Sequence, residues 1–150
     1  GRSPVRVVLA GRELPGLERK LVRTAREVPV WVFCGRGHEP AAVARLTERG
    51  CRVFEVATVE GRPWLPAVNE ALVAEGVTRL LVEGGPTLWR AFASAGLVDE
   101  IVCYRALATD LAAGRAAARA DIAALAPAHE FEVAEERMLG ADGLYRFRRK

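Results

Sequence analysis

A short segment, residues 79–89, combines a carboxylate with two adjacent glycines and a proline. It reads Arg-Leu-Leu-Val-Glu-Gly-Gly-Pro-Thr-Leu-Trp, so that Glu83 directly precedes Gly84 and Gly85. Pro86 suits the first turn of a helix, because the N–H group that proline lacks would have no partner there. A helix that begins at such a turn points free N–H groups and a partial positive charge outward, which favours a bound anion such as a phosphate.

The same turn also has a structural interpretation. A strand, two glycines and a helix form a common connection in α/β folds, and such a turn alone is as often structural as functional. Glu83 favours function, because open α/β sheets bind their ligands outside the carboxyl ends of the strands. Residues 80–82 form the apolar run expected of a strand that is covered on both faces. We therefore interpret Glu83 as a hydrogen-bond acceptor for a bound molecule and the glycine turn as an anion site.

Hydrophobic patterning predicts strands and helices along the whole chain. The closing segment is expected to be an antiparallel hairpin that turns at residues 140–143, with Asp142-Gly143 as the turn signal. The alternation of strands and helices predicts an α/β fold with a mostly parallel sheet flanked by helices. Expected strands are residues 5–9, 28–34, 51–56, 80–82, 101–104, 131–138 and 144–148; expected helices are 40–49, 64–74 and 88–95; residues 18–26 are a turn or short helix, and 107–125 a helix or a mobile segment.

Composition excludes several other kinds of protein. A chain of 150 residues with 51% hydrophobic residues fits one domain, and it has no run long enough to span a membrane. With no signal peptide at its start, we expect a cytoplasmic protein. Its three cysteines are widely spaced, which favours buried thiols over disulfides or a metal site. The basic residues 146–150 are interpreted as the solvated end of a last strand, with no nucleic acid as partner.

Other catalytic chemistry finds no support in the sequence. His38 and His129 each lack a nearby cysteine or histidine, so surface positions are favoured over ligand or base roles. Ser3 and Ser94 are the only serines, and neither has a neighbouring histidine. Motifs for a P-loop, a zinc site or a serine nucleophile are absent from the sequence. The turn that begins at Glu83 is therefore the strongest candidate site.

Several segments together resemble a known family. Leu-Leu-Val-Glu-Gly-Gly-Pro-Thr-Leu at residues 80–88 is followed by Ala-Gly-Leu-Val-Asp-Glu-Ile at 95–101 and then by Tyr104. This series resembles the C-terminal reductase domain of the bifunctional riboflavin-biosynthesis deaminase/reductase. Residues 4–9 and 21–31 are similar to the same domain in the same order, so the resemblance covers residues 4 to 105.

The resemblance implies a dihydrofolate-reductase-like fold and an NADPH-dependent enzyme. In that family the ribosyl group of 5-amino-6-(5-phosphoribosylamino)uracil is reduced to the ribitylamino product. The resemblance implies that Glu83 lies at the substrate, a phosphorylated pyrimidine, and that the following turn holds NADPH. It also implies a homodimer, and it leaves the catalytic side chain unknown. The implied cofactor-binding residues are Gly84, Gly85, Pro86, Thr87, Leu88 and Trp89.

The sequence also departs from the family pattern. No counterpart of the family's Ser-Leu-Asp-Gly-like first strand precedes Gly1, and Ala10-Gly11 stands where the family has Asp followed by Ser or Thr. Residues 106–110 replace the family's Ala-Pro and glycine-containing loop. We therefore expect residues 1–150 to form a reductase-like domain that lacks the N-terminal part of the family domain. Two hypotheses follow: a reductase, or a catalytically silent relative that retains nucleotide binding or serves assembly or regulation.

Overall fold

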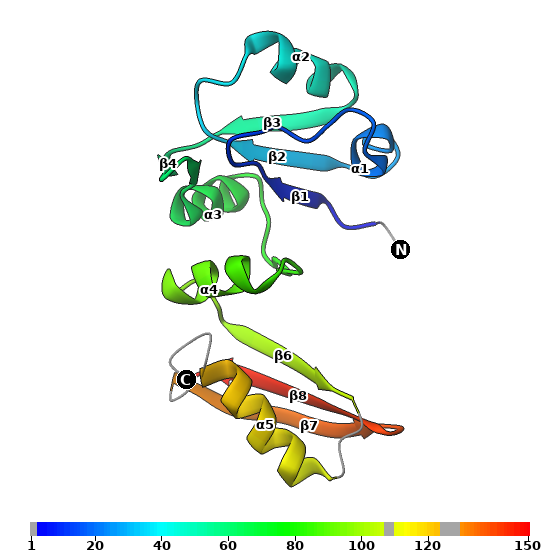
Figure 1. Cartoon of the computed structure of the whole chain (residues 1–150), viewed down its shortest axis with the longest axis vertical. Helices are drawn as coiled ribbons and strands as arrows, with labels where there is room; N and C mark the ends of the chain where they lie inside the picture. The colour runs from blue at the N-terminus through cyan, green and yellow to red at the C-terminus, as the bar shows by residue number, and fades with distance from the viewer. Residues whose placement is uncertain (1–2, 107–109, 124–129) are drawn as a thin grey trace. The chain divides into compact units, whose positions relative to one another are not determined.

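The computed structural model describes residues 3–106, 110–123 and 130–150. By its internal contacts the chain divides into two compact units, Gly1–Arg79 and Leu80–Lys150. The elements follow in the order β1 (Arg6–Leu9), α1 (Lys20–Arg23), β2 (Val30–Cys34), α2 (Pro40–Glu48), β3 (Cys51–Glu55), β4 (Thr58–Val59), β5 (Arg62–Pro63), α3 (Leu65–Ala74), α4 (Pro86–Ser94), β6 (Glu100–Arg105), α5 (Leu111–Ala123), β7 (Phe131–Leu139) and β8 (Asp142–Arg149) (Figure 1).

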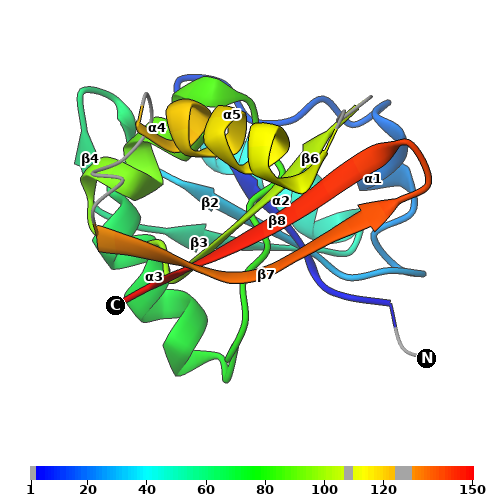
Figure 2. The same ribbon diagram turned by 90° about the horizontal axis from the view of Figure 1, so that it is seen from below.

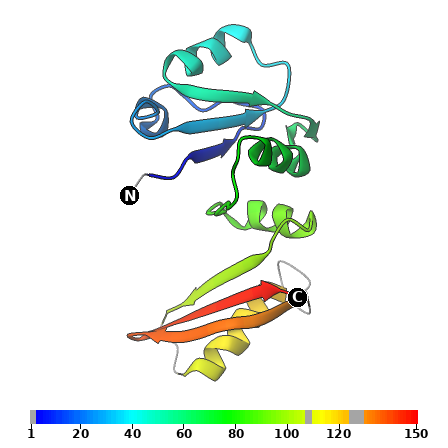
Figure 3. The ribbon, with the colours of Figure 1, turned by 180° about the vertical axis from the view of Figure 1, so that it is seen from behind.

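The first unit contains a three-stranded parallel sheet in the order β1-β2-β3. Every residue of the central strand β2 is buried, as the continuous apolar run predicts for a strand covered on both faces. Val8 lies opposite Val32 on one side of β2, and Val53 lies opposite it on the other. The three strands lie side by side, with α2 next to β3 (Figures 1 and 3).

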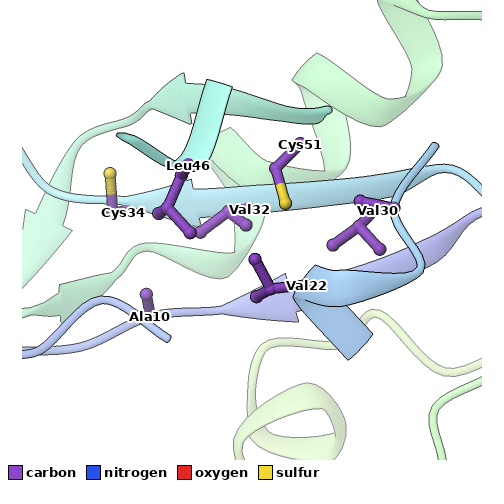
Figure 4. Packing of buried hydrophobic residues seen from close by; sticks show 8 residues of the cluster. Ala10, Val22, Val30, Val32, Cys34, Leu46 and Cys51 are labelled. Atoms are coloured by element: carbon purple, nitrogen blue, oxygen red, sulfur yellow. The ribbon is translucent and has the colours of Figure 1, made fainter. Parts of the chain in front are cut away.

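One face of this sheet forms a hydrophobic core with α1 and α2. Val22 of α1 and Leu46 of α2 pack against Val32, and all three side chains are at most 1% exposed (Figure 4). The thiols of Cys34 and Cys51 lie in the same core, which confirms the prediction that these cysteines are buried. Burial raises the pKa of Cys34, with a smaller contribution from the negative charge of Glu55, and burial likewise raises the pKa of Cys51.

A small hairpin, formed by β4 and β5, was not predicted from the sequence. Its two central residues, Glu60 and Gly61, have φ angles of 51° and 73°, which is the backbone twist of a type I′ turn. The Glu60-Gly61 pair was the sequence signal that could have predicted this turn. The hairpin lies close to the end of β2, because a Cβ atom on Gly35 would come 2.6 Å from Cγ2 of Thr58.

The second unit contains a three-stranded antiparallel sheet in the order β6-β8-β7. Helix α5 lies across this sheet (Figure 2). Ala118 and Ile122 of α5 pack against Phe131, Tyr145 and Phe147 of the strands. These residues alternate along β7 and β8, so one face of the sheet is apolar and covered by the helix. The predicted α/β class, with a parallel sheet and a C-terminal antiparallel hairpin, is confirmed.

The hairpin of β7 and β8 turns within the predicted residues 140–143, at the first two of them. Leu139 pairs with Asp142, so Gly140 and Ala141 form the turn, and Asp142-Gly143 already belongs to β8. Gly140 has a φ of 66°, which glycine adopts without steric cost. The flexible residue at the first central position therefore determines the turn, and the Asp-Gly pair does not.

The predicted strand at residues 80–82 is absent from the structure. The segment belongs to no strand or helix, and the Leu81 side chain is 76% exposed. A strand needs a neighbour to bind its N–H and C=O groups, and no described strand pairs with this segment. An apolar run alone does not provide that neighbour.

Part of the alanine-rich stretch is helical, as one of its two interpretations required. Helix α5 covers Leu111–Ala123, whereas residues 107–109 and 124–129, including His129, lie outside the described residues. Gly114 interrupts neither the helix nor its packing. None of the helices in the described ranges is long and apolar enough to cross a membrane.

Candidate functional site

The candidate site is the N-terminus of α4. Gly85 caps this helix in an extended conformation, with φ −75° and ψ −179°, and Pro86 is the first helical residue, as predicted. The carbonyl oxygen of Gly85 accepts hydrogen bonds from the N–H groups of Leu88 and Trp89 at 3.0 and 3.2 Å. The backbone of the turn is therefore held in place by the helix itself.

Backbone donors of this turn are free. Across the part of the chain that the structure describes, the N–H groups of Gly85 and Thr87 have no hydrogen-bond acceptor, and no side chain caps the helix. Free donors at a helix N-terminus carry a partial positive charge and bind anions. The turn therefore has the donors that a phosphate requires.

The two glycines of the turn differ in what surrounds them. A Cβ atom on Gly84 would lie 2.5 Å from Cδ2 and 3.0 Å from Cβ of Leu88, so Gly84 allows the segment to pass close to α4. A Cβ atom on Gly85 would meet no atom within 4 Å. Any residue can adopt the extended backbone conformation of Gly85, so neither conformation nor packing requires glycine there. The missing side chain therefore leaves open space at Gly85, beside its free N–H group.

The predicted site residues divide into outward and inward groups. Glu83, Gly85, Pro86, Thr87 and Trp89 are exposed, and Trp89 is 42% exposed. Because Trp89 follows Gly85 by four residues, both lie on the same side of α4. Gly84 and Leu88 are half-buried against each other and position the turn.

Glu83 is not at the end of a strand, because residues 80–82 form none. Its carboxylate forms no ion pair or hydrogen bond with any described side chain or backbone group. A free, exposed carboxylate next to the glycine turn is able to accept a hydrogen bond from a ligand. The sequence thus predicts Glu83 as a site residue, but it does not predict its structural setting.

A second region, at the carboxyl ends of β1 and β2, was not singled out from the sequence. The loop after β1 lies against the β4–β5 hairpin, since a Cβ atom on Gly11 would be 3.7 Å from the carbonyl oxygen of Gly61 and 4.0 Å from Cγ of Arg62. Arg12 and Arg62 are exposed and have no ion pair among the described residues. The sequence signal that could have indicated this region is the glycine in each loop that follows a parallel strand, Gly11 after β1 and Gly35 after β2.

A cavity of about 420 Å³ adjoins this edge in the first unit. It is lined by residues 13–17 of the loop after β1, by His38 and Glu39, and by Ala42, Arg45 and Leu46 of α2. His38, expected at the surface, is half-buried in this lining. In the described ranges, no group of three or more His, Cys, Asp or Glu side chains is arranged to hold a metal ion.

Comparison with known proteins identifies the family. Residues 1–106 match the RibD C-terminal domain. The chain belongs to the RibD C-terminal domain family. Over 103 residues it is 34% identical to the riboflavin biosynthesis protein RibD of Bacillus amyloliquefaciens, a match that covers 69% of this chain and 27% of that protein. The family match includes the glycine turn at α4.

Solved structures show the same fold. A pyrimidine reductase-like protein from Corynebacterium diphtheriae matches 98% of this chain and 61% of its own, with a TM-score of 0.63 and 14% identity. RibD from Acinetobacter baumannii matches 97% of this chain and 37% of its own, with a TM-score of 0.59 and 20% identity. This RibD C-terminal domain chain thus spans less than two thirds of each relative, and the likeness to the solved structures shows the fold alone.

Proposed function

We propose that this chain is an NADPH-dependent reductase domain of riboflavin biosynthesis. The reaction is the reduction of the ribosyl group of 5-amino-6-(5-phosphoribosylamino)uracil to the ribitylamino product. Membership of the RibD C-terminal domain family and the resemblance to RibD of B. amyloliquefaciens support this reaction. We further expect a cytoplasmic homodimer.

The observation that carries the cofactor assignment is the open space at Gly85. A glycine that neither conformation nor packing requires, in front of the free N–H groups of Gly85 and Thr87, fits a bound phosphate of NADPH. NADPH would supply the hydride, which leaves positioning and electrostatics to the protein. In this proposal Gly84 and Leu88 hold the turn, and Pro86 and Trp89 border the cofactor.

Glu83 is proposed to bind the phosphorylated pyrimidine. Its carboxylate is exposed and unpaired within the described part of the chain, and it directly precedes the turn. It would accept a hydrogen bond from an N–H or O–H group of the substrate. The residue that transfers protons in the reaction is not assigned.

Cofactor binding is tested by the fluorescence of NADPH on titration with the protein. Gly85→Val places a branched side chain in front of the free N–H groups, and the loss of one hydrogen bond to a charged group weakens binding roughly 10- to 100-fold. Ala95→Val, at the exposed C-terminal end of the same helix, is the matched control and should bind as the wild type does. Equal affinity in the Gly85 variant would contradict the phosphate site.

Turnover is tested by NADPH oxidation in the presence of the uracil substrate. Glu83→Gln keeps the size of the side chain but removes its charge, so NADPH affinity should be unchanged while oxidation slows. The alternative function, a catalytically silent relative that retains nucleotide binding or an assembly or regulatory role, predicts that the wild type binds NADPH without oxidising it. A wild type that binds no NADPH would overturn the cofactor assignment as well.

A further inference from the structure

We propose that the β4–β5 hairpin is a lid that a phosphate group closes by bridging Arg12 and Arg62. Arg12 lies in the loop after β1, and Arg62 lies on β5 of the hairpin. The two segments meet at the carboxyl ends of β1 and β2, where open α/β sheets bind their ligands (Figure 1). The lid lies entirely within the first unit, and its response to phosphate does not depend on the reductase assignment.

The hairpin is held together by its own contacts. At its base the N–H of Trp64 donates to the carbonyl oxygen of Ala57 at 2.8 Å, and Pro63 is buried. Its tip is the type I′ turn at Glu60-Gly61, and residues 58–62 are exposed. The hairpin is therefore able to move as one body about its base.

The hairpin is seated on the sheet by packing alone. No hydrogen bond or ion pair joins residues 58–63 to the loops after β1 and β2 within the ranges that the structure describes. The carbonyl oxygen of Gly61 lies 3.7 Å from a Cβ position on Gly11, and Cγ2 of Thr58 lies 2.6 Å from one on Gly35. Segments with few contacts of this kind open at a low cost in free energy.

The two arginines interlock at this seat. Cγ of Arg12 lies 4.0 Å from a Cβ position on Gly61, and Cγ of Arg62 lies 4.0 Å from one on Gly11. Neither guanidinium group has an ion pair or a hydrogen bond to a described residue. Like charges at one junction repel each other, so the closed position of the hairpin is opposed by its own charges.

The charge of this junction selects an anion. Glu13 and Glu60, the acids that lie nearest in the sequence, form no ion pair with any residue of the described chain. A guanidinium group presents a fork of N–H donors that matches the oxygens of a phosphate. A phosphate dianion between Arg12 and Arg62 replaces one repulsion by two attractions. The hairpin therefore closes on a phosphate group and exchanges with an open position in its absence.

The first test follows the motion of the hairpin in the full chain by NMR relaxation dispersion of backbone amides, which detects motion in the range of microseconds to milliseconds. Without phosphate, the amides of Gly11, Gly35 and Gly61 should report exchange. Saturating inorganic phosphate should lower the ratio of open to closed hairpin roughly 10-fold, the effect of one charge-assisted hydrogen bond, at an ionic strength held constant with sodium chloride. A hairpin without exchange, or exchange that phosphate leaves unchanged, would overturn the proposal.

Arg12→Ala distinguishes the lid from a packing role of the arginine. The variant lacks the repulsion, so without phosphate its hairpin should be more closed than that of the wild type by roughly 2- to 5-fold, and phosphate should have no further effect. An arginine that only packs against Gly61 gives the opposite result, a more open hairpin. Arg23→Ala, at an exposed position of α1 without an ion pair in the described chain, is the matched control and should behave as the wild type does.

Gly35→Ala tests the seat without a change of charge. Its Cβ atom would press on Cγ2 of Thr58, so the hairpin should open and inorganic phosphate should bind at least about 5-fold more weakly. Thr58→Ser lacks that methyl group and should restore phosphate binding in the double variant. Unchanged phosphate affinity in Gly35→Ala, or a double variant that binds no better than the single one, would contradict the seat.

Two sources carry this phosphate chemistry, namely free phosphate and the 2′-phosphate of NADPH, and the second source rests on the proposed function. NADH has no 2′-phosphate, so closure by NADPH but not by NADH supports the nucleotide, whereas closure by inorganic phosphate alone supports free phosphate. Failure of the reductase assignment leaves closure by inorganic phosphate in place. Failure of the lid leaves NADPH binding at the Gly85 turn in place, and closure by none of the three ligands would refute the lid.

Discussion

Gly114→Ala tests whether packing or helix propensity controls α5. Alanine is favoured over glycine inside a helix by about 1 kcal/mol, so local propensity predicts a more stable protein. The structure predicts the opposite. A Cβ atom on Gly114 would overlap the hydroxyl oxygen of Tyr145 and would lie 2.5 Å from its Cζ and 3.0 Å from its Cε2. Contacts this short require the ring or the helix to move.

The ring of Tyr145 has little room to move. It is fully buried, and a Cβ atom on Gly143 would also lie 2.5 Å from its hydroxyl oxygen. Overpacking a core costs about 1–3 kcal/mol. Because three atoms of the Tyr145 side chain are affected, we take the upper value of about 3 kcal/mol. Subtracting the gain in propensity of about 1 kcal/mol leaves a loss of roughly 2 kcal/mol in the free energy of unfolding.

Urea denaturation followed by circular dichroism measures this loss. Tyr145→Phe removes the overlapping oxygen, which is buried and has no hydrogen-bond partner in the described structure. The double variant should therefore be more stable than the sum of the single effects by at least about 1 kcal/mol. Ala116→Gly, at an exposed position of α5, is the control and should cost about 1 kcal/mol through propensity alone. A stabilising effect of Gly114→Ala, or strict additivity with Tyr145→Phe, would refute the reasoning.

Two further predictions concern stability. Gly84→Ala should lower the free energy of unfolding by about 1–2 kcal/mol, because the added methyl group would contact Leu88. Gly85→Ala should change the free energy of unfolding by less than about 1 kcal/mol, because its Cβ would meet no atom. Equal losses of the two variants in urea denaturation would contradict this difference. Burial raises the pKa of Cys34 above the ordinary 9.0, so the folded state holds the thiol proton more tightly than the unfolded chain. The resulting stability is present at neutral pH and is lost as the pH rises through the folded pKa. When the free energy of unfolding is measured in urea at increasing alkaline pH, Cys34→Val should therefore lose less stability than the wild type. Identical losses in the two proteins would contradict this prediction.

Much of the fold could be predicted from the sequence because its signals are local. Strands β1, β2 and β3 and helices α2, α3 and α4 lie within two residues of their predicted ends. Hydrophobic runs and spacing set these elements, and proline or glycine sets their ends. The free N–H groups at the start of α4 were predictable for the same reason, since a glycine pair and a proline determine a helix N-terminus without help from distant residues.

Features that depend on distant residues were decided only by the tertiary structure. The apolar residues 80–82 look like a strand but form none, because no described strand provides hydrogen-bonding partners. The meeting of the loop at Gly11 with the hairpin at Arg62 joins residues about 50 positions apart in the sequence, and no local pattern encodes it.

The glycines illustrate the division between sequence and structure. From the sequence, Gly84 and Gly85 were equivalent members of one turn, and Gly114 was an interruption of an alanine-rich stretch. The structure gives Gly84 a packing role against Leu88, leaves Gly85 open to solvent, and places Gly114 against Tyr145. The sequence shows where a glycine leaves the backbone without a side chain, but only the packed structure shows which atoms occupy the space next to it.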